Sequence, residues 1–329
     1  MTNPFRILLA LFGLAIGLAP GHAPAQDWPA KPVTLVIPFP PGNTADLVAR
    51  ALQDPLGKAL GQAIIVDNKP GAGGNIAVQN VARAPSDGYT LLLTTGSPLV
   101  INPALYRDLP FDAERDFAPV AIIGSIPMVL IARNSLPVNS MAEFLSYTRQ
   151  NEFSLTYASV GQGTFTHLGM ELFTRAAGLD LTHSPYKGAS AAHLDLIGGR
   201  VDFMFDSVAS SNALLKGGRV KALAVTSPQR SPFLPDVPTM VESADDSLAD
   251  FEVTVWTGLF APAGTPAEVV TRLNREIGVL LRSPAFTEQL AQQFIRADTP
   301  LTPEQFEQRV QSDRARWMGL SRNINLALQ

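Results

Sequence analysis

The stretch Val33–Thr44, VTLVIPFPPGNT, decides the fold. A short apolar run rich in β-branched residues, Val33–Pro38, leads through a Pro- and Gly-containing loop into a helical pattern that begins near Thr44. The alternation of strand and helix continues in Ala63–Asp67 (strand), Asn75–Arg83 (helix) and Thr90–Thr95 (strand). Continuous apolar strands separated by helices are typical of a parallel sheet covered on both faces. This part of the chain is therefore predicted to form a doubly wound α/β domain.

A second alternating set follows the long apolar stretch Val120–Ala132. Gly124 and Pro127 interrupt this stretch, which favours a strand that leaves one sheet and enters another. The later predicted elements are strands at Leu155–Ala158, Leu181–Tyr186, Val201–Asp206 and Val220–Thr226, and helices at Thr164–Ala177 and Ala189–Ile197. Val253–Phe260 predicts a strand that returns to the first sheet, so two crossing strands would form a hinge.

The end of the chain predicts two helices, Pro266–Leu281 and Pro303–Trp317, that pack on the first domain. We therefore predict an α/β protein of two domains, each a doubly wound sheet with helices on both faces. Residues 26–125 and 250–329 would form domain 1, and residues 126–249 would form domain 2.

The N-terminus predicts export. Arg6 precedes an apolar run, and Ala23-Pro24-Ala25 fits the small-x-small site that a signal peptidase cuts. Residues 1–25 are therefore predicted to be a signal peptide, the mature chain to begin at Gln26 and the protein to be periplasmic. The alternative is an uncleaved membrane anchor, for which the apolar run is short.

Composition excludes several classes of protein. The chain has no cysteine, which rules out disulfides, thiolate metal sites and a Cys nucleophile. Its formal net charge is −4, and loss of Arg6 with the signal peptide would make it −5. Because like charges form no long run, a nucleic-acid-binding face is not expected. His22 would be lost with the signal peptide, and the spacing of His167, His183 and His193 is not typical of a metal site. We predict no metal and no cofactor. We also expect a monomer.

Two loops are candidate anion sites, because ligands of open α/β sheets bind where strands end and helix N-termini expose free N–H groups. The first loop contains Phe39, Pro40, Gly42, Asn43, Thr44 and Asp46, and either Asn43 or Thr44 could cap the helix. The second loop contains Ser159, Gly161, Gly163 and Thr164. One loop lies in each predicted domain, so domain closure would bring two positive helix ends onto one anion. Both could equally be ordinary turns.

The further candidates are Thr95 and Ser97 after the third strand, His167 one helical turn after Thr164, and Lys187 and Asp206 at the ends of strands in the second domain. Lys187 could supply a cation for a second carboxylate, or it could be a solvated surface group. His167 could face the same pocket or serve as a structural hydrogen-bonding residue. Asp206 could accept from a ligand or hold a cleft loop. Gly71–Gly74 lacks the lysine and Ser/Thr of a P-loop, and we interpret it as a turn.

Several motifs resemble the Bug proteins, the receptors of tripartite tricarboxylate transport systems. The motifs lie in order along nearly the whole mature chain: Val36–Gly42 with Asp46 and Arg50, Val66–Gly74, Pro85–Leu92, Tyr157–His167, Pro185–Gly188, Val201–Asp206, Ala222–Ser227, Leu234–Thr239 and Gly258–Pro266. The resemblance implies a periplasmic binding protein of the Venus-flytrap type (type II) that captures a carboxylate between Phe39–Asp46 and Ser159–Thr164. It also implies delivery to a membrane permease. Asn43 stands where the family often has a second glycine.

Two other functions remain open from the sequence. A sensory receptor that docks on a sensor kinase would bind the same ligand. A periplasmic hydrolase could use Ser159, His167 and Asp206, although Ser159 lacks the G-x-S-x-G elbow that exposes a nucleophile.

Overall fold

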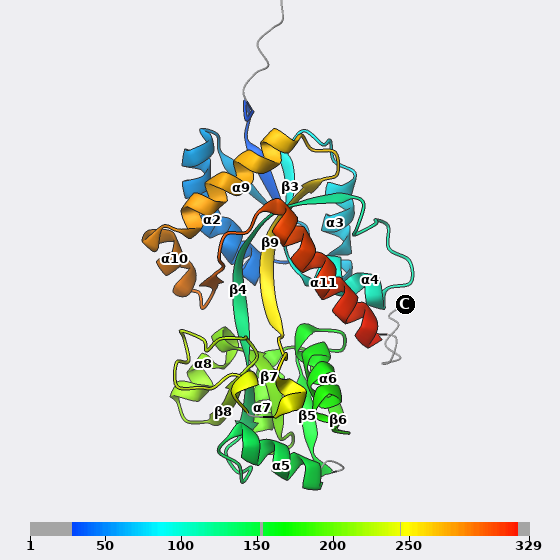
Figure 1. The fold of residues 1–329 in the computed structure, drawn as a ribbon, viewed down its shortest axis with the longest axis vertical. Helices are drawn as coiled ribbons and strands as arrows, with labels where there is room; N and C mark the ends of the chain where they lie inside the picture. The colour runs from blue at the N-terminus through cyan, green and yellow to red at the C-terminus, as the bar shows by residue number, and fades with distance from the viewer. Residues whose placement is uncertain (1–27, 152–153, 244, 322–329) are drawn as a thin grey trace, which may run out of the picture.

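The computed structural model describes residues 28–151, 154–243 and 245–321. Figure 1 shows an upper and a lower half, joined by two long strands, β4 (Phe117–Arg133) and β9 (Thr254–Pro262). The predicted signal peptide lies outside the described residues. The two crossing strands predicted from the sequence are β4 and β9, and β4 extends beyond the predicted run at both ends.

Each half contains a set of parallel strands. In the upper half the order is β2 (Ile64–Asn68), β1 (Val33–Ile37), β3 (Thr90–Thr95), β9 and β4, with β10 (Arg296–Ala297) also on β4. In the lower half β4 pairs with β8 (Val220–Val225) and with β7 (Phe203–Ser207), which is followed by β5 (Thr156–Ser159) and β6 (Thr182–Pro185). The prediction of parallel sheets is correct for β1–β3 and β5–β7. The sequence left the directions of β4 and β9 open; the two strands are antiparallel to each other, because one leaves the upper half and the other returns.

Helices cover both faces of the upper strands. Leu35 and Ile37 pack with α2 (Thr44–Leu60), α9 (Ala267–Leu281) and α10 (Pro284–Ala291). Val36, whose side chain points the other way, packs with α3 (Asn75–Ala82). Two further helices, α4 (Asn102–Leu105) and α11 (Pro303–Ser321), lie on the side of α3 (Figure 1). Strands buried on both faces read as unbroken apolar runs, which is the pattern seen in the sequence.

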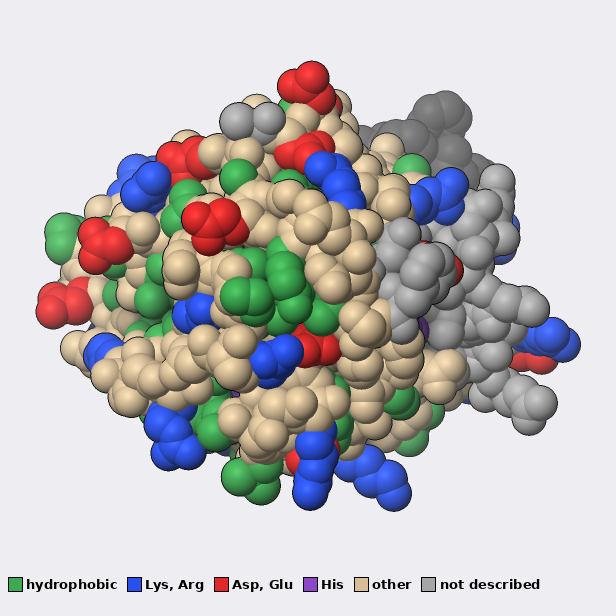
Figure 2. All heavy atoms as spheres, turned by 90° about the horizontal axis from the view of Figure 1, so that it is seen from below, with side chains coloured by type: hydrophobic (Ala, Val, Ile, Leu, Met, Phe, Trp, Pro, Cys, Tyr) green, Lys and Arg blue, Asp and Glu red, His purple; other side chains and the backbone are tan. Residues whose placement is uncertain are grey.

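The lower half repeats this arrangement. Phe203 and Phe205 pack with α5 (Met141–Asn151) and α6 (Phe165–Ala177), whereas Met204 packs with α7 (Ala189–Ile197) and α8 (Val208–Lys216). Figure 2 shows the end of this half from below, where acidic and basic side chains are interspersed around a small apolar patch.

Four α-helices among the described residues were not predicted from the sequence: α4, α5, α8 and α10. A signal for α5 was present, because Ser140 and Glu143 have the spacing of a capping box, although Glu143 bonds to the residue before Ser140. The Glu143 amide donates to Ser140 Oγ at 3.2 Å, and the Asn139 amide donates to Glu143 Oε2 at 2.7 Å.

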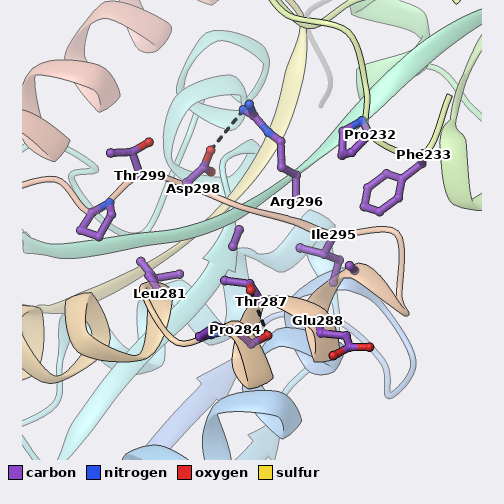
Figure 3. Close-up of a pocket in the computed structure, with 13 residues that line it drawn as sticks. Pro232, Phe233, Leu281, Pro284, Thr287, Glu288, Ile295, Arg296, Asp298 and Thr299 are labelled. Carbon is purple, nitrogen blue, oxygen red and sulfur yellow. Dashed lines mark hydrogen bonds and ion pairs between the residues drawn. The ribbon is translucent and has the colours of Figure 1, made fainter. Parts of the chain in front are cut away.

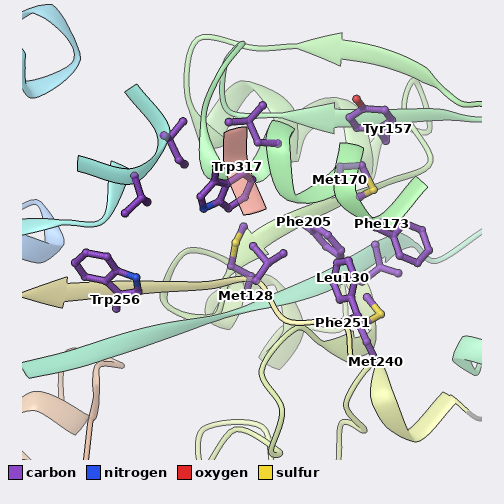
Figure 4. Packing of buried hydrophobic residues seen from close by; sticks show 14 of the residues in the cluster. Met128, Leu130, Tyr157, Met170, Phe173, Phe205, Met240, Phe251, Trp256 and Trp317 are labelled. Atoms are coloured by element: carbon purple, nitrogen blue, oxygen red, sulfur yellow. The ribbon is translucent and has the colours of Figure 1, made fainter. Parts of the chain in front are cut away.

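The hinge region has a continuous apolar core (Figure 4). Pro127 of β4 still pairs with β9, and the next residue, Met128, pairs with β7. The Trp256 indole N–H donates to Asp313 Oδ2 of α11 at 2.7 Å. Trp317, also on α11, meets Phe165 of the lower half edge-to-face, with ring centroids 5.7 Å apart. Helix α11 therefore contacts both halves, and the predicted domain boundaries at 125/126 and 249/250 stay predictions.

Candidate ligand-binding site

The strand directions bring the carboxyl ends of the two parallel sets face to face. Strand β3 runs against β9, β9 runs against β4, and β4 runs against β7, so β3 and β7 point toward each other. Thr95 at the end of β3 is level with Thr257, which is level with Gly124 of β4. Ser207 at the end of β7 is level with Met128. Four residues of β4 separate the two levels, or roughly 13 Å at ~3.3 Å per residue.

Both candidate loops lie at these facing edges. The first follows β1, which is parallel to β3, and the second follows β5, which is parallel to β7. The loop that carries Lys187 follows β6, which is parallel to β5. The Tyr186 amide donates to Ser159 O at 3.0 Å and the Gly188 amide donates to Val160 O at 3.2 Å, which fixes the Lys187 loop against the second candidate loop.

Asp46 holds the first loop. Its side chain is 1% exposed, and Oδ2 accepts from the Gly42 amide and from Arg50 Nε, both at 2.8 Å. Oδ1 accepts from Asn68 Nδ2 at 3.1 Å, and Asn68 also donates to Phe39 O at 3.0 Å. Both carboxylate oxygens are thus engaged within the protein. These hydrogen bonds make Asp46 a support of the loop, and its contact with a ligand stays a prediction.

The charged form of Asp46 is favoured by these contacts. Burial disfavours the carboxylate, but the hydrogen bonds from Arg50, the Gly42 amide and Asn68 outweigh it, so the pKa of Asp46 lies below its usual value. Gly42 has φ +84°, a conformation that L side chains rarely adopt, and no atom would contact a Cβ there.

Asn43 caps α2. Its Oδ1 accepts from the Ala45 amide at 3.0 Å, which leaves Thr44 as the first residue of the helix. Of the two capping residues that the sequence left open, Asn43 is the one used. Phe39, Asn43 and Thr44 are half-buried, whereas Pro40 and Gly42 are exposed.

The second loop is closed by hydroxyl groups. Thr164 Oγ1 donates to Gly161 O at 2.7 Å, and Thr166 Oγ1 accepts from the Val160 amide at 3.0 Å. Thr164 is the N-terminal boundary of α6, but its side chain makes no capping hydrogen bond. Gly161 and Gly163 have φ of +150° and +75°, which explains the two glycines in this loop.

The predicted hydrolase residues do not form a triad. Ser159 is fully buried, and its Oγ lies 2.8 Å from His183 Nε2. His167 Nδ1 instead accepts from the Gly163 amide at 3.0 Å. Asp206 is 3% exposed, with Oδ2 2.7 Å from His193 Nε2 and Oδ1 accepting from the Ser207 amide at 2.8 Å. His167 and Asp206 therefore make structural hydrogen bonds, and their contact with a ligand stays a prediction.

The remaining candidates differ in exposure. Thr95 is 5% exposed and Ser97 is half-buried at the turn that follows β3. Lys187 is exposed and makes no hydrogen bond or ion pair with another described residue. Gly96, between Thr95 and Ser97, lies against Trp256, where a Cβ would come within 2.9 Å of the ring. This glycine is required for packing of the hinge.

Sequence reasoning missed His183, Asn68 and Thr166 as supports of the loops. His183 is level with Tyr157 on the neighbouring strand, a pairing that no sequence spacing indicates. Asn68 could have been found, because it is a polar residue at the carboxyl end of a predicted strand.

A separate hollow of about 830 Å³ lies beside the hinge (Figure 3). Pro232 and Phe233 of the lower half form one wall, and α10 with the segment around Arg296 forms the other. Phe233 contacts Phe294 edge-to-face, with ring centroids 5.6 Å apart. This hollow contains none of the predicted site residues.

Comparison with known proteins assigns the family. Residues 48–326 match the family described as "Tripartite tricarboxylate transporter family receptor". The chain belongs to this family. A UPF0065 protein from the tcbD-tcbE intergenic region of Pseudomonas sp. (strain P51) is 40% identical over 313 residues, which cover 94% of this chain and 92% of that protein.

Two solved structures of the same kind contain ligands. Rpa4515 of R. palustris with adipate has a TM-score of 0.75 and 36% identity, covering 92% of this chain and 99% of that one. MatC of Rhodopseudomonas palustris with bound malate has a TM-score of 0.71 and 34% identity, covering 89% and 100%. The predicted resemblance and the predicted periplasmic-binding-protein fold are confirmed.

Two searches of the described residues found nothing further. No helix between residues 28 and 321 that the structure describes is long and apolar enough to cross a membrane. Among the same residues, no cluster of three or more His, Cys, Asp or Glu side chains is arranged to hold a metal ion.

Proposed function

We propose that this receptor captures a small carboxylate between its two halves in the periplasm and delivers it to a permease of the tripartite tricarboxylate type. One observation carries the proposal. Two glycine-containing loops, each opening a helix, lie at carboxyl ends of strands that point toward each other. The free N–H groups and positive end of such a helix attract anions.

The proposed ligand has two carboxylates. Relatives of known structure are described with adipate and with malate, both dicarboxylates. In this chain the two loops would hold one carboxylate, and Lys187 is a cation at the same edge that pairs with no other described residue. Phe39, Pro40, Thr95 and Ser97 would surround the remainder of the ligand.

Ligand-dependent stabilisation tests the proposal. Thermal unfolding should be measured with a panel that includes malate, adipate and their diamides. A ligand at about 100 times its Kd stabilises the folded state by roughly 2.7 kcal/mol. We expect the acids to raise Tm without being consumed and the diamides to have no effect. Equal stabilisation by the diamides would contradict the anion site. Formation of a product would instead support the alternative function of a hydrolase.

A charge placed at each helix N-terminus tests the site. Thr44→Asp adds a carboxylate to the first turn of α2, a position where acidic residues favour the helix, so folding should survive. Its repulsion of the ligand should weaken binding at least tenfold, which is about 1.4 kcal/mol. Thr44→Asn is the neutral control of the same shape.

Gln162→Glu makes the same test at the second loop, where Gln162 is exposed between the two glycines. Here the parent side chain is itself the neutral control. Calorimetric titration should show a similar tenfold loss. If both acidic variants bind as tightly as their neutral counterparts, the carboxylate does not lie between these loops.

Export can be tested independently of the ligand. We propose that residues 1–25 are removed, because a charged residue, an apolar run and the Ala23-Pro24-Ala25 site occur in that order. The intact mass of protein released from the periplasm should correspond to a chain that begins at Gln26. Retention of Met1 in that fraction would contradict cleavage.

A further inference from the structure

The second candidate loop rests on a stack of three rings. His183 of β6 lies between Tyr157 of β5 and His167 of α6. Its ring centroid is 4.8 Å from that of Tyr157 and 4.0 Å from that of His167, with interplanar angles of 15° and 11°. The three rings come from three elements, so the stack fixes their relative positions.

Each histidine contacts one end of the loop. Ser159, where the loop begins, places its Oγ 2.8 Å from His183 Nε2. Near the other end, the Gly163 amide donates to His167 Nδ1 at 3.0 Å. A ring nitrogen that accepts from a backbone N–H carries no proton, so the neutral His167 has its proton on Nε2. That nitrogen lies 3.8 Å from Glu171 Oε1.

The surroundings keep the imidazoles neutral. Burial lowers the pKa of His167 to about 4. Burial, together with the neighbouring His167, lowers the pKa of His183 to about 4, and Glu171 opposes this change. The Tyr157 hydroxyl, the other titratable group of the stack, donates to Glu171 Oε1. Only a neutral imidazole can accept from the Gly163 amide.

We infer that His167 and His183 are positioning residues for the ligand loop: they hold Ser159 and Gly163, and thereby the backbone between them, without contacting the ligand. The inference rests on the proposed function, since it assigns these histidines to the loop that would bind the carboxylate.

Two substitutions at one position separate positioning from packing. His167→Leu fills the buried space but removes the acceptor, whereas His167→Gln retains a side-chain acceptor for the Gly163 amide. Calorimetric titration with malate and with adipate should show at least a tenfold loss of affinity for the leucine variant. The glutamine variant should stay within threefold of the parent. Met170→Leu, buried on the same helix, is the control and should bind like the parent.

Hydrogen exchange of the Gly163 amide gives a readout that needs no ligand. The exchange should be at least tenfold faster in His167→Leu than in the parent, and close to the parent rate in His167→Gln. Nitrogen-15 spectra of the parent should show His167 as the Nε2–H tautomer. The pair His183→Leu and His183→Gln repeats the comparison at Ser159 if the His167 variants fail to fold.

The outcomes distinguish the two proposals. If neither malate, adipate nor another acid of the panel binds the parent, the proposed function fails while the exchange measurement still decides the role of the histidines. If the parent binds an acid and His167→Leu shows parent affinity with parent-like exchange of the Gly163 amide, the positioning role is wrong.

Discussion

The two candidate loops are held by opposite chemistry. The loop after β1 is fixed by a charged carboxylate, Asp46, which accepts three hydrogen bonds. The loop after β5 rests on neutral imidazoles of His167 and His183. Both supports are buried, but acid acts on them at different pH. The pKa of Asp46 lies below its usual value, so its carboxylate stays charged until the pH is low. The two histidines must stay uncharged in the folded protein, although the ordinary pKa of histidine is near 6.5. The second loop should therefore respond first to acidification.

Removal of the charge from Asp46 should have the largest effect. Asp46→Asn replaces one acceptor oxygen by an NH₂ group that faces donors, and hydrogen bonds to charged groups contribute about 1.5–3 kcal/mol each. We expect the free energy of unfolding in urea to fall by about 3 kcal/mol. The exposed Asp54→Asn on the same helix is the control and should change stability by less than ~0.5 kcal/mol. Equal effects of the two substitutions would show that Asp46 does not support the loop.

Acid should destabilise the fold through His167. Its folded-state pKa is about 4 and its unfolded pKa is near 6.5, so the unfolded chain binds more protons between these values. Stability is therefore lost as the pH falls from about 6.5 toward 4. From pH 7 to pH 5 the loss from this group is about 2 kcal/mol.

Urea unfolding of the parent and of His167→Gln at both pH values measures this loss. The glutamine variant should lose about 2 kcal/mol less than the parent over the interval, because glutamine does not titrate. Parallel pH profiles of the two proteins would mean that His167 is not kept neutral by the fold.

The smallest effect should come from Gly42→Ala. At φ +84° with open space around the Cβ, alanine costs about 1 kcal/mol of stability through the backbone alone. Gly61→Ala at the other end of α2, with φ +75° and equally open space, should cost about the same. Malate affinity should fall only for Gly42→Ala, by about threefold or more. If both variants bind alike, Gly42 is a turn residue and nothing more.

The sequence predicted elements where one physical rule dominates. Unbroken apolar runs such as Leu91–Leu93 predicted the buried strands, and the Pro-Gly-Asn turn predicted the start of α2. The strand Val120–Ala132 was predicted to cross between halves, and β4 does so. The antiparallel direction of β4 and β9 was missed, because strand direction depends on the path of the chain between sheets and leaves no local pattern.

The family could be predicted from motifs in the sequence. The α/β class and the two loops at strand ends could also be predicted, since periodicity and turn chemistry act between neighbours in the chain. The hydrogen-bond partners of the individual side chains follow only from the tertiary structure. It pairs Ser159 with His183, 24 residues away, and places His193 rather than His167 beside Asp206. It also turns Asp46 inward onto Asn68. Hydrogen-bond partners of buried groups are chosen by strand register and helix packing, which bring together residues that no spacing in the sequence connects.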